Sequence, residues 1–419
     1  MVQGPAKPQG TSREYSRPYR PTALKVGHGL ARALRLDGMP SLDPDRLIAR
    51  ARRAEGLNDL GEPDLEPLRV LVRSIEAEAQ LHPLGRVATA GRLIQTLRNR
   101  LRAVAEFERD PTILTRPLPS PIVISGLQRT GTTLLHRLLA SDPRLRALRS
   151  WEALNPAALR GAPRGDKDPR RVQAARAEAG LKWLSPDFFA VHPVEASAPE
   201  EEVLLLDHSF LSTVPEATLR VPTYSAWLEQ QDQTQAYTML RRLLQLLTSQ
   251  EGPDRWVLKT PHHLEWLDTL WNVFPDATVV MTHRDPVVTV GSFCSMVAHG
   301  RGVMSDVVDP KEIGRDWLEK VGRMMDRALA SRDARGDRGV IDVQYADLMR
   351  DPLGEIARIR AAASLEPDAA ADAAVAAALA SMPKDRHGSH SYDLADFGLT
   401  STMVADRFAA YRERFTPKR

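Results

Sequence analysis

The stretch that decides the fold is PIVISGLQRTGTTLLHRLLASDP, residues 121–143. Its short apolar run beside a proline is typical of a buried strand, and its leucine-rich end is typical of a helix. Between them, Gly126 and Gly131 fit the glycines of the phosphate-binding pattern G-x-x-x-x-G-K-[ST], and Thr133 fits its last position. The lysine position holds Thr132. Because backbone N–H groups at a helix N-terminus bind anions, the stretch predicts a phosphate-type site that works without the usual lysine.

Three further strand–helix pairs follow this one along the chain. The expected strands are RWVLKTP (255–261), ATVVMTHRDP (277–286) and GVIDVQYADL (339–348). Helices are expected over 262–274, 287–300 and 352–363. Strands that alternate with helices predict a three-layer α/β fold, in which a P-loop-like parallel sheet is flanked by helices. Ligands of such sheets bind beyond the carboxyl ends of the strands, so residues just after each strand are the candidates for function.

Composition narrows the class of protein. The 419 residues are 42% apolar and 26% charged, which is ordinary for a globular protein, and the net charge of +3 gives no reason to expect a nucleic-acid partner. The single cysteine, Cys294, excludes an internal disulfide and suits a reducing compartment. We see no signal-peptide core and no apolar run long enough for an integral membrane segment, so we expect a cytoplasmic protein.

Three motifs in a fixed order carry a family resemblance. GLQRTGTT (126–133), LKTPHHL (258–264) and HRDPVVTVGS (283–292) together resemble the sulfotransferases that use 3′-phosphoadenosine 5′-phosphosulfate (PAPS). The similarity is greater to a bacterial branch related to tyrosylprotein and glycan sulfotransferases, and it covers roughly residues 120–300. It implies transfer of a sulfuryl group from PAPS to a hydroxyl group of a small-molecule or lipid-like acceptor, without a metal site. The acceptor and the oligomeric state are not implied.

The resemblance also implies a donor site. The residues that would hold the 5′-phosphosulfate are Arg129, Thr130, Gly131, Thr132 and Thr133. Arg284 and Ser292 would bind the 3′-phosphate, and Tyr345 would contact the nucleotide. Elementary helix chemistry agrees, because Asp285 and Pro286 are favoured at a helix start and would begin a helix directly after Arg284.

Catalysis needs positive charge on the leaving oxygen and a base for the acceptor proton. The resemblance implies Lys259 for the first task. For the second it leaves two residues open, Glu152 in RSWEALNP and His263 in TPHHL. Three further groups, which we expect to be structural, lie near these motifs: His262, His192 and Glu201. The stretch Lys384–Tyr392 has the composition of a basic lid.

The same motifs divide the chain into regions. Residues 1–26 are rich in proline, glycine and basic side chains and predict a flexible tail. Residues 27–115 predict a helical layer, with one helix capped by Asp43, begun by Pro44 and stopped by Gly56. Residues 116–419 would form the sulfotransferase α/β domain. Within it, the mostly helical insertion 150–250 either shapes an acceptor pocket or extends the scaffold.

Two rival functions remain open from the residues alone. A nucleotide-dependent kinase of P-loop fold is disfavoured by Thr132 in the lysine position and by the lack of a convincing Mg²⁺-binding acid. The HRD triplet at 283–285 does not help that rival, because the kinase pattern H-R-D-x-x-x-x-N finds Val290 in its asparagine position. The other rival is a nucleotide-binding scaffold without catalysis.

Overall fold

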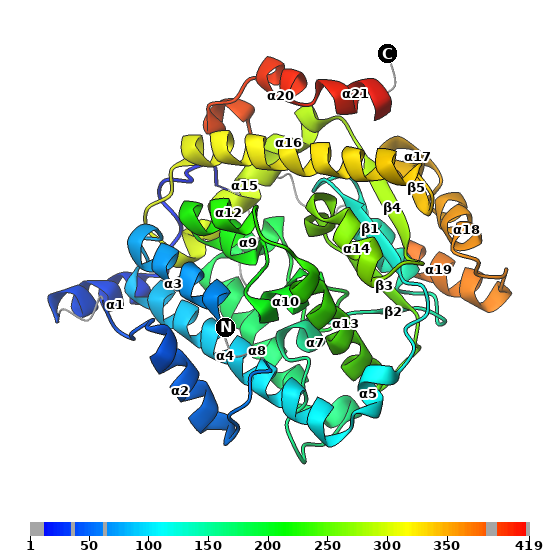
Figure 1. The fold of residues 1–419 in the computed structure, drawn as a ribbon. Coiled ribbons are helices and arrows are strands. Elements are labelled where there is room, and N and C mark those ends of the chain that lie inside the picture. The colour runs from blue at the N-terminus through cyan, green and yellow to red at the C-terminus, as the bar shows by residue number, and fades with distance from the viewer. Residues whose placement is uncertain (1–11, 35–37, 62–64, 383–391, 416–419) are drawn as a thin grey trace, which may run out of the picture.

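The computed structural model describes residues 12–34, 38–61, 65–382 and 392–415. Its centre is one parallel sheet with the strand order β2-β3-β1-β4-β5 (Figure 1). The strands are β1 Ile122–Gly126, β2 Arg146–Ala147, β3 Trp256–Lys259, β4 Thr278–His283 and β5 Val340–Gln344. The predicted parallel α/β fold is confirmed. The edge strand β2 was not expected, because two residues are too short to show a periodic pattern.

Helices cover both faces of the sheet. Successive residues of a strand point to opposite faces, and in β1 Val123 joins a large hydrophobic cluster while Ile122 and Ile124 join a smaller one. The smaller cluster receives side chains from α6 (Thr132–Leu139), α18 (Pro352–Ala362) and α19 (Ala369–Ser381). The large cluster receives them from α13 (Thr234–Thr248), α14 (Leu267–Val273) and α16 (Pro310–Arg335). The sheet is therefore the middle of three layers (Figure 1).

The N-terminal helices extend the large cluster away from the sheet. They are α1 (Thr22–Ala33), α2 (Pro44–Glu55), α3 (Glu66–Glu78), α4 (Pro83–Arg109) and α5 (Thr112–Thr115). Helix α2 has the predicted ends: Asp43 accepts a hydrogen bond from the backbone N–H of Arg46 at 2.9 Å, and Gly56 ends it with φ of 66°. Apolar residues of α2, α3 and α4 belong to the same buried cluster as β1, so this layer and the α/β part share one core.

The segment before α1 differs from the predicted flexible tail. Tyr15 is 4% exposed, and its hydroxyl donates a hydrogen bond to Ser295 Oγ at 3.0 Å. Arg13 forms an ion pair with Asp396 at 2.6 Å, and α1 begins at Thr22, inside the predicted tail. Burial of an aromatic ring offsets the entropy lost on ordering, so the expectation is wrong for residues 12–26. Residues 1–11 lie outside the described part of the chain.

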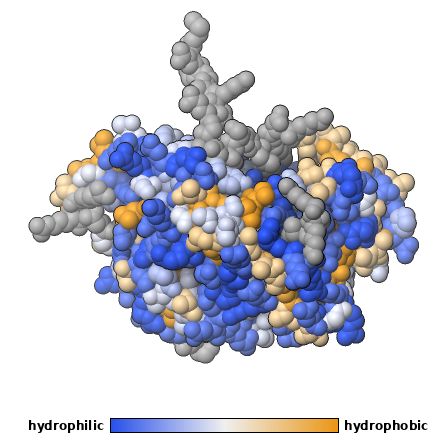
Figure 2. All heavy atoms as spheres, turned by 90° about the horizontal axis from the view of Figure 1, so that it is seen from above, coloured by the Kyte–Doolittle hydropathy of each residue, from blue (hydrophilic) through white to orange (hydrophobic). Residues whose placement is uncertain are grey.

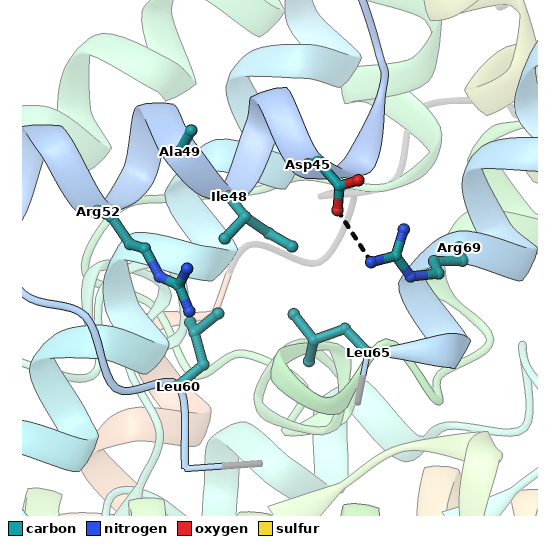
Figure 3. Close-up of a pocket in the computed structure, with 7 residues that line it drawn as sticks. All are labelled: Asp45, Ile48, Ala49, Arg52, Leu60, Leu65 and Arg69. Atoms are coloured by element: carbon teal, nitrogen blue, oxygen red, sulfur yellow. Dashed lines mark hydrogen bonds and ion pairs between the residues drawn. The ribbon is translucent and has the colours of Figure 1, made fainter. Parts of the chain in front are cut away.

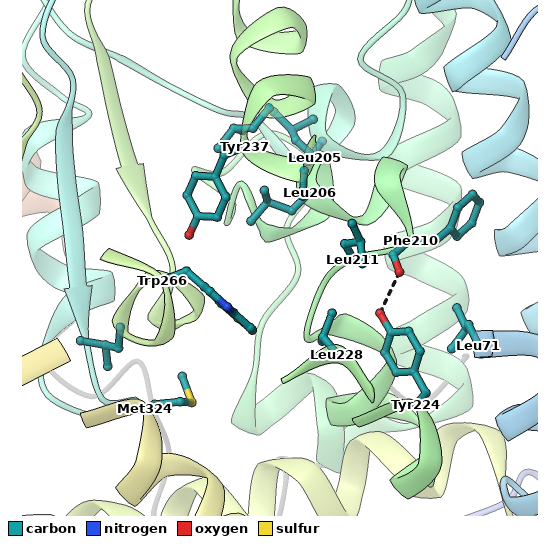
Figure 4. Packing of buried hydrophobic residues seen from close by; sticks show 14 of the residues in the cluster. Leu71, Leu205, Leu206, Phe210, Leu211, Tyr224, Leu228, Tyr237, Trp266 and Met324 are labelled. Carbon is teal, nitrogen blue, oxygen red and sulfur yellow. Dashed lines mark hydrogen bonds between the residues drawn. The ribbon is translucent and has the colours of Figure 1, made fainter. Parts of the chain in front are cut away.

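The insertion 150–250 is helical, as expected. Its α-helices are α7 (Ser150–Leu154), α8 (Pro169–Leu184), α9 (Pro186–Val191), α10 (Val203–Leu206), α11 (Val214–Thr218), α12 (Pro222–Leu228) and α13, with short 3₁₀ turns η1 (Gly165–Lys167) and η2 (Asp207–Ser209). Its side chains fill the large cluster beside the sheet, where the hydroxyl of Tyr224 donates to the carbonyl of Phe210 at 3.0 Å (Figure 4).

Two elements end at other residues in the structure than the sequence predicted. The expected strand 339–348 stops at Gln344, and α17 (Tyr345–Arg350) follows at once. The expected helix 262–274 is split into the 3₁₀ turn η3 (Pro261–Glu265) and α14. The chain continues from β4 into α15 (Pro286–Met304) and finishes with η4 (Leu394–Phe397), α20 (Ser401–Arg407) and α21 (Ala409–Phe415).

Hydrophilic residues cover most of the face seen in Figure 2, with smaller hydrophobic areas between them. Among the helices of the described residues, none is both long and apolar enough to span a membrane.

Candidate functional site

All five strands are parallel, so their carboxyl ends lie along one edge of the sheet. The register pairs Ile124 of β1 with Lys259 of β3, and Gly126 of β1 with Thr282 of β4. It also pairs His283 of β4 with Gln344 of β5. The residues that directly follow β1, β4 and β5, together with Lys259 at the end of β3, therefore lie along the same edge. This is where the sequence predicted the functional groups.

The loop between β1 and α6 has the backbone of an anion-binding turn. Arg129 and Gly131 have φ of 69° and 91°, and α6 begins directly afterwards at Thr132. A Cβ atom on Gly131 would lie 2.8 Å from the side chain of Leu348 and 3.3 Å from that of Tyr345. The positive φ favours glycine at position 131, and a Cβ atom there would also crowd the side chain of Leu348. The N-terminus of α6 leaves backbone N–H groups for an anion.

The hydroxyl groups of this loop have different surroundings. The side chain of Thr130 is buried, donates to the carbonyl of Leu127 at 2.6 Å and lies 2.5 Å from Thr282 Oγ1. Thr130 therefore uses its hydroxyl to hold the turn against β4. Thr132 is partly buried and Thr133 is exposed, at the first two positions of α6. Their hydroxyl groups can reach a ligand at the helix N-terminus.

Two arginines and a tyrosine converge beside the loop. Arg284 Nη1 donates to the carbonyl oxygen of Arg129 at 3.0 Å, and its guanidinium lies 4.0 Å from the ring centroid of Tyr345. Burial lowers the pKa of Arg129, and the positive charge of Arg284 lowers it further. Two like charges brought together at the edge of a sheet favour the binding of anionic groups beside them.

Ser292 has a buried hydroxyl group that makes no hydrogen bond within the described residues. It lies on α15, which starts as predicted: Asp285 caps it by accepting from the N–H of Val287 at 3.1 Å, and Pro286 is its first residue. Ser292 is 2% exposed, and its Oγ has no hydrogen-bond partner among the described residues. Buried polar atoms are nearly always bonded, so this atom fits an oxygen ligand.

Tyr392 covers the first turns of α15. Its hydroxyl donates to the carbonyl of Val288 at 2.8 Å, and a Cβ atom on Gly291 would lie 3.0 Å from its ring. It also lies close enough to Arg129 to influence the pKa of that guanidinium. Tyr392 is the last residue of the predicted lid, and the remainder of that stretch, 384–391, lies outside the described residues.

Lys259 ends β3 and forms an ion pair with Glu201. Lys259 Nζ lies 2.5 Å from Glu201 Oε1, while its backbone N–H donates to Glu202 Oε2 at 2.7 Å. Burial alone would raise the pKa of Glu201. The charges of Lys259 and His192, with hydrogen bonds from Lys259 and Thr260, outweigh it and lower that pKa. Glu201 is therefore ionised at neutral pH, beside the predicted catalytic lysine.

Glu152 is held by donors from its own chain. Its Oε1 accepts from Arg146 Nη2 at 2.5 Å, and its Oε2 accepts from the backbone N–H of Arg149 at 2.9 Å. The side chain is 4% exposed, and Arg146 stacks on Trp256 with its guanidinium 4.5 Å from a ring centroid. These contacts show that Glu152 stabilises the segment around it. Its role as the base is a separate question and stays a prediction.

His263 is also enclosed. Its side chain is 0% exposed, with Nδ1 2.7 Å from the hydroxyl of Tyr237 and Nε2 2.6 Å from Glu202 Oε1. Its neighbour His262 is equally buried, and burial places the pKa of that imidazole well below its usual value. His192, directly after α9, is only partly buried. The base role predicted for His263 likewise stays a prediction.

A separate cavity of about 480 Å³ lies in the N-terminal layer, where α2 faces the start of α3 (Figure 3). Ile48, Leu60 and Leu65 point into it, and the pair Asp45–Arg69, at 2.9 Å, closes one side. None of the predicted site residues lines this cavity.

Comparisons with known proteins identify the family of the chain. A model of the sulfotransferase family matches residues 121–369. The sulfotransferase STF1 from Mycobacterium tuberculosis is 35% identical, with a TM-score of 0.76 over 88% of this chain and 98% of that one. The sulfotransferase STF9 from Mycobacterium avium is 27% identical, with a TM-score of 0.82 over 91% of this chain and 98% of that one. No curated protein sequence matches. The chain belongs to the sulfotransferase family.

Proposed function

We propose that the protein transfers a sulfuryl group from PAPS to a hydroxyl group of a small-molecule or lipid-like acceptor. The observation that carries this proposal is a phosphate-type loop without its lysine, beside which Arg284 and the unpartnered hydroxyl of Ser292 supply groups for a second anion. A nucleoside triphosphate concentrates its charge on consecutive phosphates, whereas PAPS carries a separate 3′-phosphate. Two anion sites at one sheet edge suit a donor of the second kind.

The residues fit each part of this donor. The loop N–H groups, with Thr132, Thr133 and Arg129, would hold the 5′-phosphosulfate at the N-terminus of α6. Arg284 and the unpartnered hydroxyl of Ser292 would bind the 3′-phosphate, and the ring of Tyr345 packs against the Arg284 guanidinium.

In the proposed reaction the acceptor oxygen forms a bond to sulfur, and the bond from sulfur to the 5′-phosphate oxygen breaks in line with it. The electron pair of the broken bond stays on the phosphate oxygen. Lys259 and Arg129 supply positive charge where that negative charge develops. With both cations in place, we propose that transfer does not require a metal ion.

Calorimetric titration with adenosine 3′,5′-bisphosphate, in the presence of a chelator, tests the donor class. We expect wild type to bind, Arg284→Ala to bind at least 10-fold more weakly, about 1.4 kcal/mol, and the exposed control Arg73→Ala to bind normally. If wild type instead binds only ATP, and only with Mg²⁺, the kinase is favoured and the proposal fails. Binding without transfer of radiolabelled sulfuryl to any hydroxyl compound would favour a scaffold.

A further inference from the structure

Membership of the family leaves open which residue takes the proton from the acceptor. Both carboxylate oxygens of Glu152 and both ring nitrogens of His263 have hydrogen-bond partners within the chain, and both side chains are buried. A base needs a free lone pair that reaches the acceptor hydroxyl. A third group, Glu201, also accepts hydrogen bonds, from Lys259 and Thr260, but its side chain is the most exposed of the three.

Glu201 lies at the reacting centre by virtue of its partner. Its side chain is 19% exposed, against 4% for Glu152 and 0% for His263. Its Oε1 contacts the Nζ atom of Lys259, which is the proposed stabiliser of the leaving oxygen. With the donor bound as proposed, a carboxylate in hydrogen-bond contact with that ammonium would lie near the sulfur.

The backbone around Glu201 is anchored, so its carboxylate is held in a defined place. The N–H of Glu201 donates to Glu200 Oε1 at 2.9 Å, while Glu200 Oε2 accepts from Ser150 Oγ at 3.0 Å. The N–H of Glu200 donates to the carbonyl of Leu148 at 2.8 Å, next to the edge strand β2. A base on a fixed segment needs little reorganisation during the reaction.

We infer that Glu201 is the general base of the proposed sulfuryl transfer. As the bond between the acceptor oxygen and sulfur forms, the hydroxyl proton moves to a carboxylate oxygen of Glu201, and the 5′-phosphate leaves with the electron pair. The anionic donor competes with Glu201 for Lys259, so donor binding draws the ammonium to the sulfuryl group and frees the carboxylate. This inference rests on the proposed function.

The groups around Glu201 set how it responds to pH. Lys259 faces it from β3, His192 faces it from the end of α9, and Glu200 and Glu202 flank it in sequence. The ammonium of Lys259 is the largest of these influences and favours the ionised carboxylate. Removal of the carboxylate should therefore abolish the acidic limb of the pH–rate profile.

The test compares Glu201→Gln with Glu195→Gln, a partly exposed carboxylate of the same segment that pairs with Arg137. The assay measures transfer of radiolabelled sulfuryl from PAPS to two phenols, para-methylphenol, which is un-ionised at neutral pH, and para-nitrophenol, which ionises near neutral pH and needs little help from a base. We expect Glu201→Gln to lose 100-fold or more in kcat with para-methylphenol and less than 10-fold with para-nitrophenol. Glu195→Gln should match wild type with both.

Titration with adenosine 3′,5′-bisphosphate separates this inference from the proposed function. Because a neutral amide in place of the Glu201 carboxylate does not compete for Lys259 by charge, we expect the Glu201→Gln variant to bind the nucleotide as tightly as wild type or more tightly. Equal losses with both phenols, nucleotide binding weakened 10-fold, or a kcat within 3-fold of wild type would each overturn Glu201 as the base. Failure of wild type itself to bind the nucleotide would instead overturn the proposed function.

Discussion

Replacement of Glu152 by glutamine tests whether this carboxylate is structural. The substitution leaves the buried guanidinium of Arg146 without its counter-charge, although Arg146 keeps contacts to the carbonyls of Leu247 and Glu251 and to the ring of Trp256. Breaking a buried ion pair from one side costs about 3–5 kcal/mol. The remaining contacts of Arg146 favour the lower end of this range. Loss of one hydrogen-bond acceptor at the start of α7 adds about 1 kcal/mol. We therefore expect the free energy of unfolding to fall by about 3–4 kcal/mol.

Urea denaturation measures this change, and sulfuryl transfer at saturating donor measures its effect on catalysis. Folded domains are stable by about 5–15 kcal/mol, so the variant should fold and keep kcat within about 3-fold of wild type. The double variant Arg146→Met with Glu152→Leu, which removes both charges, should recover much of the lost stability. A loss of kcat above 100-fold with less than 1 kcal/mol of destabilisation would refute this reasoning and make Glu152 the base.

Three more predictions concern the leaving group, the N-terminal segment and pH. Lys259→Ala should lower kcat by at least 100-fold, while nucleotide binding should weaken less than in Arg284→Ala, because the charge of Lys259 acts mainly in the transition state. Steady-state kinetics and calorimetry measure the two effects, and equal losses in kcat and in binding would contradict this reasoning. Tyr15→Ala should destabilise by about 3–5 kcal/mol in urea, whereas the exposed Tyr19→Ala should change stability by about 0.5 kcal/mol or less; equal effects would show that the segment is not docked. Burial lowers the pKa of His136 to about 3, so below its unfolded pKa of about 6.5 the unfolded chain binds a proton that the folded chain does not. Stability should therefore fall as pH drops from about 6.5 to 4, and His136→Gln should reduce that slope by up to about 1.4 kcal/mol per pH unit; an unchanged slope would exclude this source.

Short-range chemistry made part of the fold predictable. The apolar run at 122–126, the glycine of the turn and the helix that follows depend on residues within a few positions of one another. The same holds for the caps at Asp43 and Asp285, since each carboxylate bonds an N–H two or three residues ahead. Errors arose where tertiary contacts outweighed local composition, as in the segment 12–26, where Tyr15 is buried against α15 far along the chain.

From the sequence alone one can determine the parallel α/β fold, the loop without lysine, and the edge at which Lys259 and Arg284 lie. These follow from periodicity, from local backbone preferences and from the rule that parallel strands end together. The tertiary structure alone decided which acid and imidazole groups are available. Glu201 meets Lys259 across 58 positions, and His263 meets Glu202 across 61. Residue type shows that a group can act as a base, but burial and partners from distant segments decide whether its lone pair is free to do so.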